Sequence, residues 1–290
     1  MTTKPRLITI LGPTASGKTT MAVRFAQRYN AEIVCADSRT VYRGMDIGTA
    51  KPSKADQQQV RHHLLDICDP NRAFSSAEFK VLAEEAIQDI QSRDKLALLV
   101  GGSGMYIDSI LFDYKFRSDL STVSTEELHH KSILELQTIA QKKYPKEYID
   151  IDIKNKRRLI QLISKGPSKD DDRKNKKIGS LVIGIGQNKA VIKQNIEIRT
   201  KNILNQNFVQ EVEYLRSRFG ETAVLKQTTG YCQVLDYLNG GIKNMDDLYQ
   251  AIVNATWQLS RKQMTWFKRN KNITWIDNDI EAERLIQQYL

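Results

Sequence analysis

The sequence predicts an α/β fold in which helices cover a parallel sheet, and three observations support this. Short apolar runs at 6–11, 31–36, 96–100 and 181–185 are typical of buried strands. A glycine-rich segment directly follows the first run. Between the second and third runs, 76–92 repeats apolar residues at helical spacing. Strands that alternate with helices in this way form parallel sheets.

The stretch 116–180 differs from the segments on either side of it. It has no clear strand pattern and is rich in Lys, Glu and Gln, and its polar run at 166–177 indicates a mobile loop. We therefore expect a core of 1–115 and 181–290 that carries a mostly helical insertion of 116–180. In the last third of the chain the pattern predicts helices at about 190–218, 227–239 and 245–269.

Composition restricts the class of protein and the kind of partner. With 290 residues, of which 40% are hydrophobic, the chain can bury a sizeable core. The net charge of +10 favours a polyanionic partner. The apolar runs are too short for a membrane span and no signal-peptide pattern is present, so we expect a cytoplasmic protein without a membrane partner. The three cysteines are far apart and indicate neither a zinc site nor a disulfide framework.

The glycine-rich segment fits the phosphate-loop pattern GxxxxGK[ST]. It lies between a predicted strand and a predicted helix, which is the context this motif requires, and it predicts a P-loop NTPase-like core. Backbone N–H groups of such a loop bind phosphate oxygens, Lys18 adds a positive charge, and Thr19 offers a hydroxyl to Mg²⁺. The residues expected to bind a diphosphate are Gly12, Pro13, Thr14, Ala15, Ser16, Gly17, Lys18 and Thr19.

Several further segments resemble one family, the tRNA dimethylallyltransferases. DSRTVYRGMDIGTAKP at 37–52 closely resembles the family's DS…Y.GMDIGTAKP block. HHLLDI at 62–67, GGSGMYI at 101–107 and RKQMTWF at 261–267 are similar to its HHLLDI, GGTGLYI and KRQ.TWF elements. Shorter similarities lie at 74–79, 196–212 and 230–231. The segments occur in the family's order, which is more specific than any one motif.

The resemblance implies a reaction and its catalytic residues. A dimethylallyl group would pass from dimethylallyl diphosphate to the exocyclic amine of the adenosine 3′-adjacent to the anticodon, and pyrophosphate would leave. Lys18 and Arg199 would stabilise the charge of the leaving group. Asp37, after the second predicted strand, would accept the proton of the amine. Ser103 stands where the family usually has threonine and keeps a hydroxyl near the reacting centre.

Basic and aromatic residues predict where the anticodon stem-loop of tRNA binds. Five cations in 261–271, here called the C-terminal basic cluster, surround Trp266 and Phe267. They are Arg261, Lys262, Lys268, Arg269 and Lys271. The alternative for the two aromatic residues is that they face the core. The residues expected to contact tRNA are Asp37, Ser38, Arg39, Thr40, Ser103, Arg157, Arg158, Gly230, Tyr231, Arg261, Lys262, Gln263, Trp266 and Lys268.

The sequence also departs from the family pattern, and other functions stay open. The expected RALE after Arg158 is absent, and Asn195 and Trp257 replace expected arginines. These departures concern the insertion and its contacts more than the chemistry. The alternatives are a P-loop small-molecule kinase, a prenyltransferase of free adenine nucleotides, and an RNA-binding protein without catalysis. We expect a monomer.

Overall fold

The computed structural model of the protein describes residues 7–116, 125–166 and 179–290. The chain divides into two compact units: Met1–Asp113 with Lys176–Leu290, and Tyr114–Asn175. Apart from Gly166, the predicted loop at 166–177 lies outside the described residues.

The larger unit is built on a six-stranded sheet in which every neighbouring pair is parallel, in the order β3-β2-β4-β1-β5-β6. This confirms the predicted α/β fold. The strands are β1 (Leu7–Leu11), β2 (Ala31–Ala36), β3 (His62–His63), β4 (Leu96–Gly101), β5 (Ser180–Ile185) and β6 (Thr274–Ile276). The four predicted strands are β1, β2, β4 and β5. The edge strands β3 and β6 are too short to give a period in the sequence.

The register of the sheet brings three loops together at one edge. Leu11, the last residue of β1, pairs with Gly101 at the end of β4, and Gly101 also pairs with Ala36 at the end of β2. The segments that follow these strands therefore leave the sheet at the same carboxyl edge. Ligands of open parallel sheets bind at this edge, where the strand order reverses.

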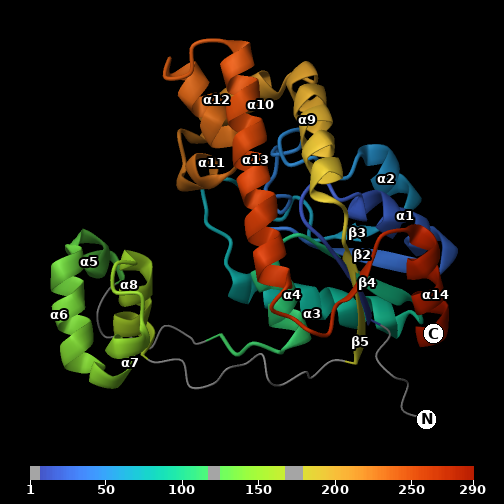
Figure 1. The fold of residues 1–290 in the computed structure, drawn as a ribbon, viewed down its shortest axis with the longest axis horizontal. Helices are drawn as coiled ribbons and strands as arrows, with labels where there is room; N and C mark the ends of the chain where they lie inside the picture. Colours follow the sequence, from blue (N-terminus) through green and yellow to red (C-terminus); the bar gives the residue numbers. More distant parts are fainter. Residues whose placement is uncertain (1–6, 117–124, 167–178) are drawn as a thin grey trace. The chain divides into compact units, whose positions relative to one another are not determined.

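In the described residues of the larger unit, ten helices surround the sheet and extend beyond its carboxyl edge (Figure 1). They are α1 (Lys18–Arg28), α2 (Lys54–Gln59), α3 (Ser76–Ser92), α4 (Gly104–Leu111), α9 (Lys189–Asn205), α10 (Phe208–Phe219), α11 (Ala223–Gln227), α12 (Tyr231–Leu238), α13 (Met245–Phe267) and α14 (Asp279–Tyr289). α9 and α13 run side by side and bury Ile192, Ile196 and Val253 between them (Figure 1). None of the helices in the described part of the chain could span a membrane.

Two predicted helices have different bounds in the structure, so their predicted lengths were wrong. The expected helix at 190–218 is broken after Asn205, and Asn207 has a φ of 65° in the left-handed region, which asparagine tolerates. The expected helix at 227–239 corresponds to α12, which begins only at Tyr231, after Gly230 with a φ of 91°, whereas α11 ends at Gln227. Phe208 at the start of α10 and Tyr231 at the start of α12 lie in a second core, where neither side chain has exposed surface.

The smaller unit is helical in its described residues. Its helices are α5 (Thr125–His130), α6 (Ile133–Lys143), α7 (Pro145–Asp150) and α8 (Lys156–Lys165). α6 starts at a capping box in which the Ser132 hydroxyl accepts the Glu135 N–H. Leu136, Leu159 and Ile163 are buried in a core of this unit's own.

Candidate active site

The loop after β1 has the backbone of an anion-binding site. Ala15 and Gly17 both have left-handed conformations, with φ of 63° and 85°. Residues that alternate between right- and left-handed conformations turn their N–H groups toward a common centre. Gly17 also precedes α1 without a side-chain cap, so the first N–H groups of that helix are open to a ligand. The loop is therefore suited to phosphate oxygens.

Lys18 places a cation on this loop. Its ammonium donates a hydrogen bond to the Pro13 carbonyl at 3.2 Å. Burial of the ammonium lowers the pKa of Lys18 to about 8, although part of the residue is exposed. The Asp37 carboxylate acts in the opposite direction, and Arg199 adds to the lowering. The structure thus brings Lys18, Asp37 and Arg199, which are distant in the sequence, into one electrostatic site.

Asp37 lies directly after β2 at the carboxyl edge and is half-buried. Its Oδ1 accepts the Arg39 N–H at 2.8 Å. The loop after β4 is joined to this segment, because the Ser103 Oγ accepts the Ser38 N–H at 2.9 Å and the Ser103 N–H donates to the Ala36 carbonyl. Ser103 therefore holds the backbone beside Asp37 in place.

Arg199 reaches this edge from α9. Its Nη1 donates to the Thr14 hydroxyl at 3.1 Å, and its Nη2 donates to the Thr49 carbonyl at 2.9 Å. Burial of the guanidinium lowers the pKa of Arg199, and the Asp37 carboxylate opposes that shift. Arg199 thus lies between the phosphate loop and the segment that contains Thr49.

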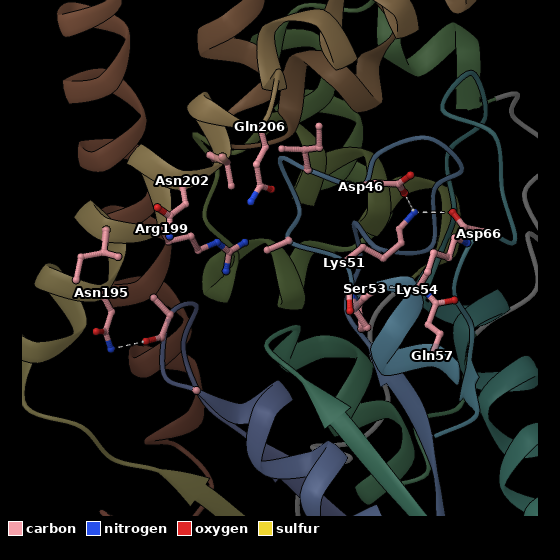
Figure 2. Close-up of a pocket in the computed structure, with 17 residues that line it drawn as sticks. Asp46, Lys51, Ser53, Lys54, Gln57, Asp66, Asn195, Arg199, Asn202 and Gln206 are labelled. Atoms are coloured by element: carbon pink, nitrogen blue, oxygen red, sulfur yellow. Dashed lines mark hydrogen bonds and ion pairs between the residues drawn. The ribbon is translucent and has the colours of Figure 1, made fainter. Parts of the chain in front are cut away.

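A cavity of about 610 Å³ opens beside Arg199. Ala15 and Gly17 form one wall, α9 forms another, and the segment from Asp46 to Gln57 closes the far side. Figure 2 shows the Arg199 guanidinium extending into the cavity. This volume suits a small organic ligand, since sites for such ligands range over roughly 300–1,000 Å³. A molecule bound to the phosphate loop could therefore extend into this cavity.

Two residues expected to contact RNA also make contacts inside the protein. The Gln263 Oε1 accepts the Thr14 N–H at 2.8 Å, and its Nε2 donates to the Gly102 carbonyl at 3.0 Å. The Trp266 Nε1 donates to the Asp108 carboxylate at 2.8 Å. These contacts account for the positions of both side chains. Phe267 is buried, which is the alternative left open for it above.

Gly230 and Tyr231, which are also expected to contact tRNA, lie in the second core. Both residues are buried, and the Tyr231 side chain has no exposed surface. The Tyr231 hydroxyl donates to Glu211 at 2.5 Å. The similarity at 230–231 therefore marks a packed turn of the second core.

Other residues expected to bind RNA do lie at the surface. On and after α13, Arg261, Lys262 and Lys268 are exposed, and Arg157 and Arg158 are exposed on α8. Near Asp37, Ser38 and Arg39 are half-buried. Thr40 is only 5% exposed, and its hydroxyl has no hydrogen-bond partner among the described residues.

Three residues that build this edge were assigned no role from the sequence. Asn195 donates to the Ala15 carbonyl at 3.1 Å. The Thr49 carbonyl accepts a hydrogen bond from Arg199, and the Glu211 carboxylate accepts one from the Ile47 N–H in the same loop. Glu211 and Thr49 both lie in segments that resemble the family, but similarity alone did not show what they touch.

Comparison with known proteins identifies the family. Residues 40–270 match the model of the IPP transferase family. The tRNA dimethylallyltransferase of Bifidobacterium longum subsp. infantis is 39% identical over 93% of this chain and 86% of its own. That of Macrococcus caseolyticus is 33% identical over 97% and 94%. The crystal structure of a tRNA Δ(2)-isopentenylpyrophosphate transferase from Staphylococcus epidermidis is 30% identical, with a TM-score of 0.74 over 99% of this chain and 100% of that one. The chain therefore belongs to the IPP transferase family.

Proposed function

We propose that this protein transfers a dimethylallyl group from dimethylallyl diphosphate to tRNA. The acceptor is the exocyclic amine of the adenosine 3′-adjacent to the anticodon, and pyrophosphate is released. The observation that carries the proposal is the convergence of Lys18, Arg199 and Asp37 at one edge of the sheet. Relatives named tRNA dimethylallyltransferase match nearly the whole chain.

The phosphate loop and Arg199 bind the diphosphate and stabilise it as it leaves. Negative charge grows on the bridging oxygen as the allylic carbon becomes cation-like. Fixed N–H groups, the Lys18 ammonium and the Arg199 guanidinium act on this charge without having to reorganise. Arginine suits the task because its planar group donates to two oxygens at once. The buried Ser16 hydroxyl has no partner among the described residues, so it is a further donor for this anion.

Asp37 acts on the acceptor. The lone pair of an exocyclic adenine amine is delocalised into the ring, so the amine gains nucleophilicity as its proton is removed. The Asp37 carboxylate accepts this proton as the new carbon–nitrogen bond forms. The Ser103 hydroxyl and the Arg39 N–H keep the segment after β2 in the required conformation.

The same loop can hold Mg²⁺. Thr19 is exposed in the first turn of α1, next to Lys18, and its hydroxyl oxygen is a hard ligand of the kind that Mg²⁺ prefers. Mg²⁺ bound by Thr19 and the diphosphate would supply further positive charge to the leaving group. The protein's own part is to present the Thr19 oxygen beside the phosphate loop.

Exposed cations bind the tRNA, and the adenosine leaves its stack to reach Asp37. The C-terminal basic cluster contacts the phosphates of the anticodon stem-loop from the larger unit. Arg157 and Arg158 do so from the insertion at 116–180, which we propose to be a tRNA-binding domain. The enzyme acts as a monomer, with dimethylallyl diphosphate and tRNA as its partners.

The test is incubation of the protein with dimethylallyl diphosphate, Mg²⁺ and unmodified tRNA, followed by mass analysis of the nucleosides. The expected product is an adenosine whose mass has increased by one dimethylallyl group in place of a hydrogen. Free adenine nucleotide and labelled ATP serve as parallel substrates. A modified free nucleotide with unmodified tRNA, or phosphate transfer from ATP, would contradict the proposal.

A further inference from the structure

Glu211, on α10, accepts hydrogen bonds from three successive backbone N–H groups. Its Oε2 accepts those of Asp46 at 3.0 Å and Ile47 at 2.7 Å, and its Oε1 accepts that of Gly48 at 3.2 Å. The Oε1 also accepts the Tyr231 hydroxyl at 2.5 Å. A single carboxylate thus fixes a loop that lies more than 160 residues away in the sequence. Hydrogen bonds to an ionised acceptor are stronger than those between neutral groups.

Packing holds the same loop from its other side. A Cβ added to Gly48 would lie 2.2 Å from the Phe208 ring and 2.6 Å from the Tyr231 ring. The two rings meet edge to face, with centroids 5.0 Å apart. The loop therefore has no room to shift toward α10 or α12.

The next residue in the chain connects this loop to the leaving-group site. The Thr49 carbonyl follows Gly48 and accepts the Nη2 of Arg199 at 2.9 Å. The other end of the guanidinium contacts Thr14 of the phosphate loop. The direction of Arg199 therefore depends on where the Thr49 carbonyl lies, and Glu211 fixes the residues just before it.

We propose that Glu211 is a positioning residue for the transfer reaction, acting through the 46–49 backbone to hold the Arg199 guanidinium at the diphosphate. Its two oxygens accept four hydrogen bonds, and it does not line the cavity beside Arg199. It therefore acts on Arg199 and not on the substrates. The inference rests on the proposed role of Arg199 in binding the leaving group.

The main test uses Glu211→Gln, which keeps the shape of the side chain but has only one acceptor oxygen. Two of the four donors then lose their acceptor. We expect kcat to fall by roughly 10- to 100-fold, because a small misplacement of a catalytic group can have that effect. Affinity for inorganic pyrophosphate should also fall, while tRNA affinity stays unchanged. The matched control is Glu213→Gln, an exposed residue of the same helix, which should leave all three quantities unchanged.

A double-mutant cycle separates positioning from a general structural effect. If Glu211 acts through Arg199, the variant with both Glu211→Gln and Arg199→Ala should be about as slow as Arg199→Ala alone. If the decreases in turnover of the two single variants instead multiply in the double variant, the inference is overturned while the role of Arg199 stays intact. An Arg199→Ala variant with unchanged turnover and pyrophosphate affinity would overturn both that role and the inference.

A milder variant covers the possibility that Glu211→Gln does not fold. Tyr231→Phe removes only one of the four hydrogen bonds and keeps the packed ring. It should lower pyrophosphate affinity by a smaller factor than Glu211→Gln does. This decrease in affinity should also disappear in a variant that already carries Arg199→Ala. Unchanged pyrophosphate affinity in both Glu211→Gln and Tyr231→Phe would refute the positioning role. Thermal unfolding of each variant verifies that it is folded when its affinity is compared with that of the wild type.

Discussion

Lys18 makes the binding of the leaving group depend on pH. Burial lowers its pKa to about 8, so the ammonium of the ligand-free protein titrates within reach of ordinary assays. Between about pH 7 and about pH 9, the charged fraction of a group with this pKa falls from roughly 90% to roughly 10%. If the charged form binds the anion, apparent affinity for pyrophosphate should fall by about tenfold, or about 1.4 kcal/mol, over this range. The contribution of the Lys18 ammonium to pyrophosphate affinity is present at pH values below its pKa and is lost above it.

The assay is calorimetric titration of the protein with inorganic pyrophosphate at several pH values. Pyrophosphate itself also titrates, so the comparison is with Lys18→Met, a neutral side chain of similar length. Lys18→Met should bind pyrophosphate more weakly than the wild type at neutral pH. Its affinity should change with pH only as pyrophosphate itself titrates, without the additional tenfold decrease expected for the wild type. Parallel pH profiles for wild type and Lys18→Met would refute the reasoning, because they would show that no titration of the Lys18 ammonium is coupled to anion binding in this pH range.

Three further predictions concern the base, the RNA surface and stability. Asp37→Ala should lower turnover by about 10²- to 10⁴-fold and leave tRNA affinity unchanged, and a decrease of less than about threefold in steady-state assays would exclude the base role. Neutralising one member of the C-terminal basic cluster should flatten the dependence of log affinity for tRNA on log salt by up to roughly one unit, whereas wild-type slopes in every such variant would place the RNA surface elsewhere. Glu32, with a side chain only 3% exposed, accepts hydrogen bonds from Arg93 and Lys95, so Glu32→Gln should cost about 1–3 kcal/mol in urea unfolding at neutral pH. The hydrogen bond from Arg93 holds the pKa of Glu32 well below its ordinary value of 4.5, so its contribution is present above that value and is lost as the pH falls below it. The difference between wild type and Glu32→Gln should therefore shrink in acid, and a constant difference would contradict this account.

Elements whose pattern is local could be predicted from the amino-acid sequence alone. Four strands, the phosphate loop and the helix at 76–92 could be predicted because each is encoded by the spacing of neighbouring residues. The meeting of the phosphate loop, Asp37 and Ser103 also follows from a local rule, since parallel strands end at the same edge of a sheet. The resemblance to a family then connected these residues to a reaction.

The side chains that hold this site from distant parts of the sequence became visible only in the folded protein. The sequence indicated only that Gln263 lies in a basic helix, but in the structure it bridges Thr14 and Gly102, and Thr14 lies 249 residues away in the sequence. Tyr231 is buried against Glu211, and the expected helix at 190–218 breaks so that Phe208 can join the same core. Such contacts depend on how several packed helices fit together. No periodicity in one segment encodes them, because the partner that satisfies each polar group is brought near only by the folding of the whole unit.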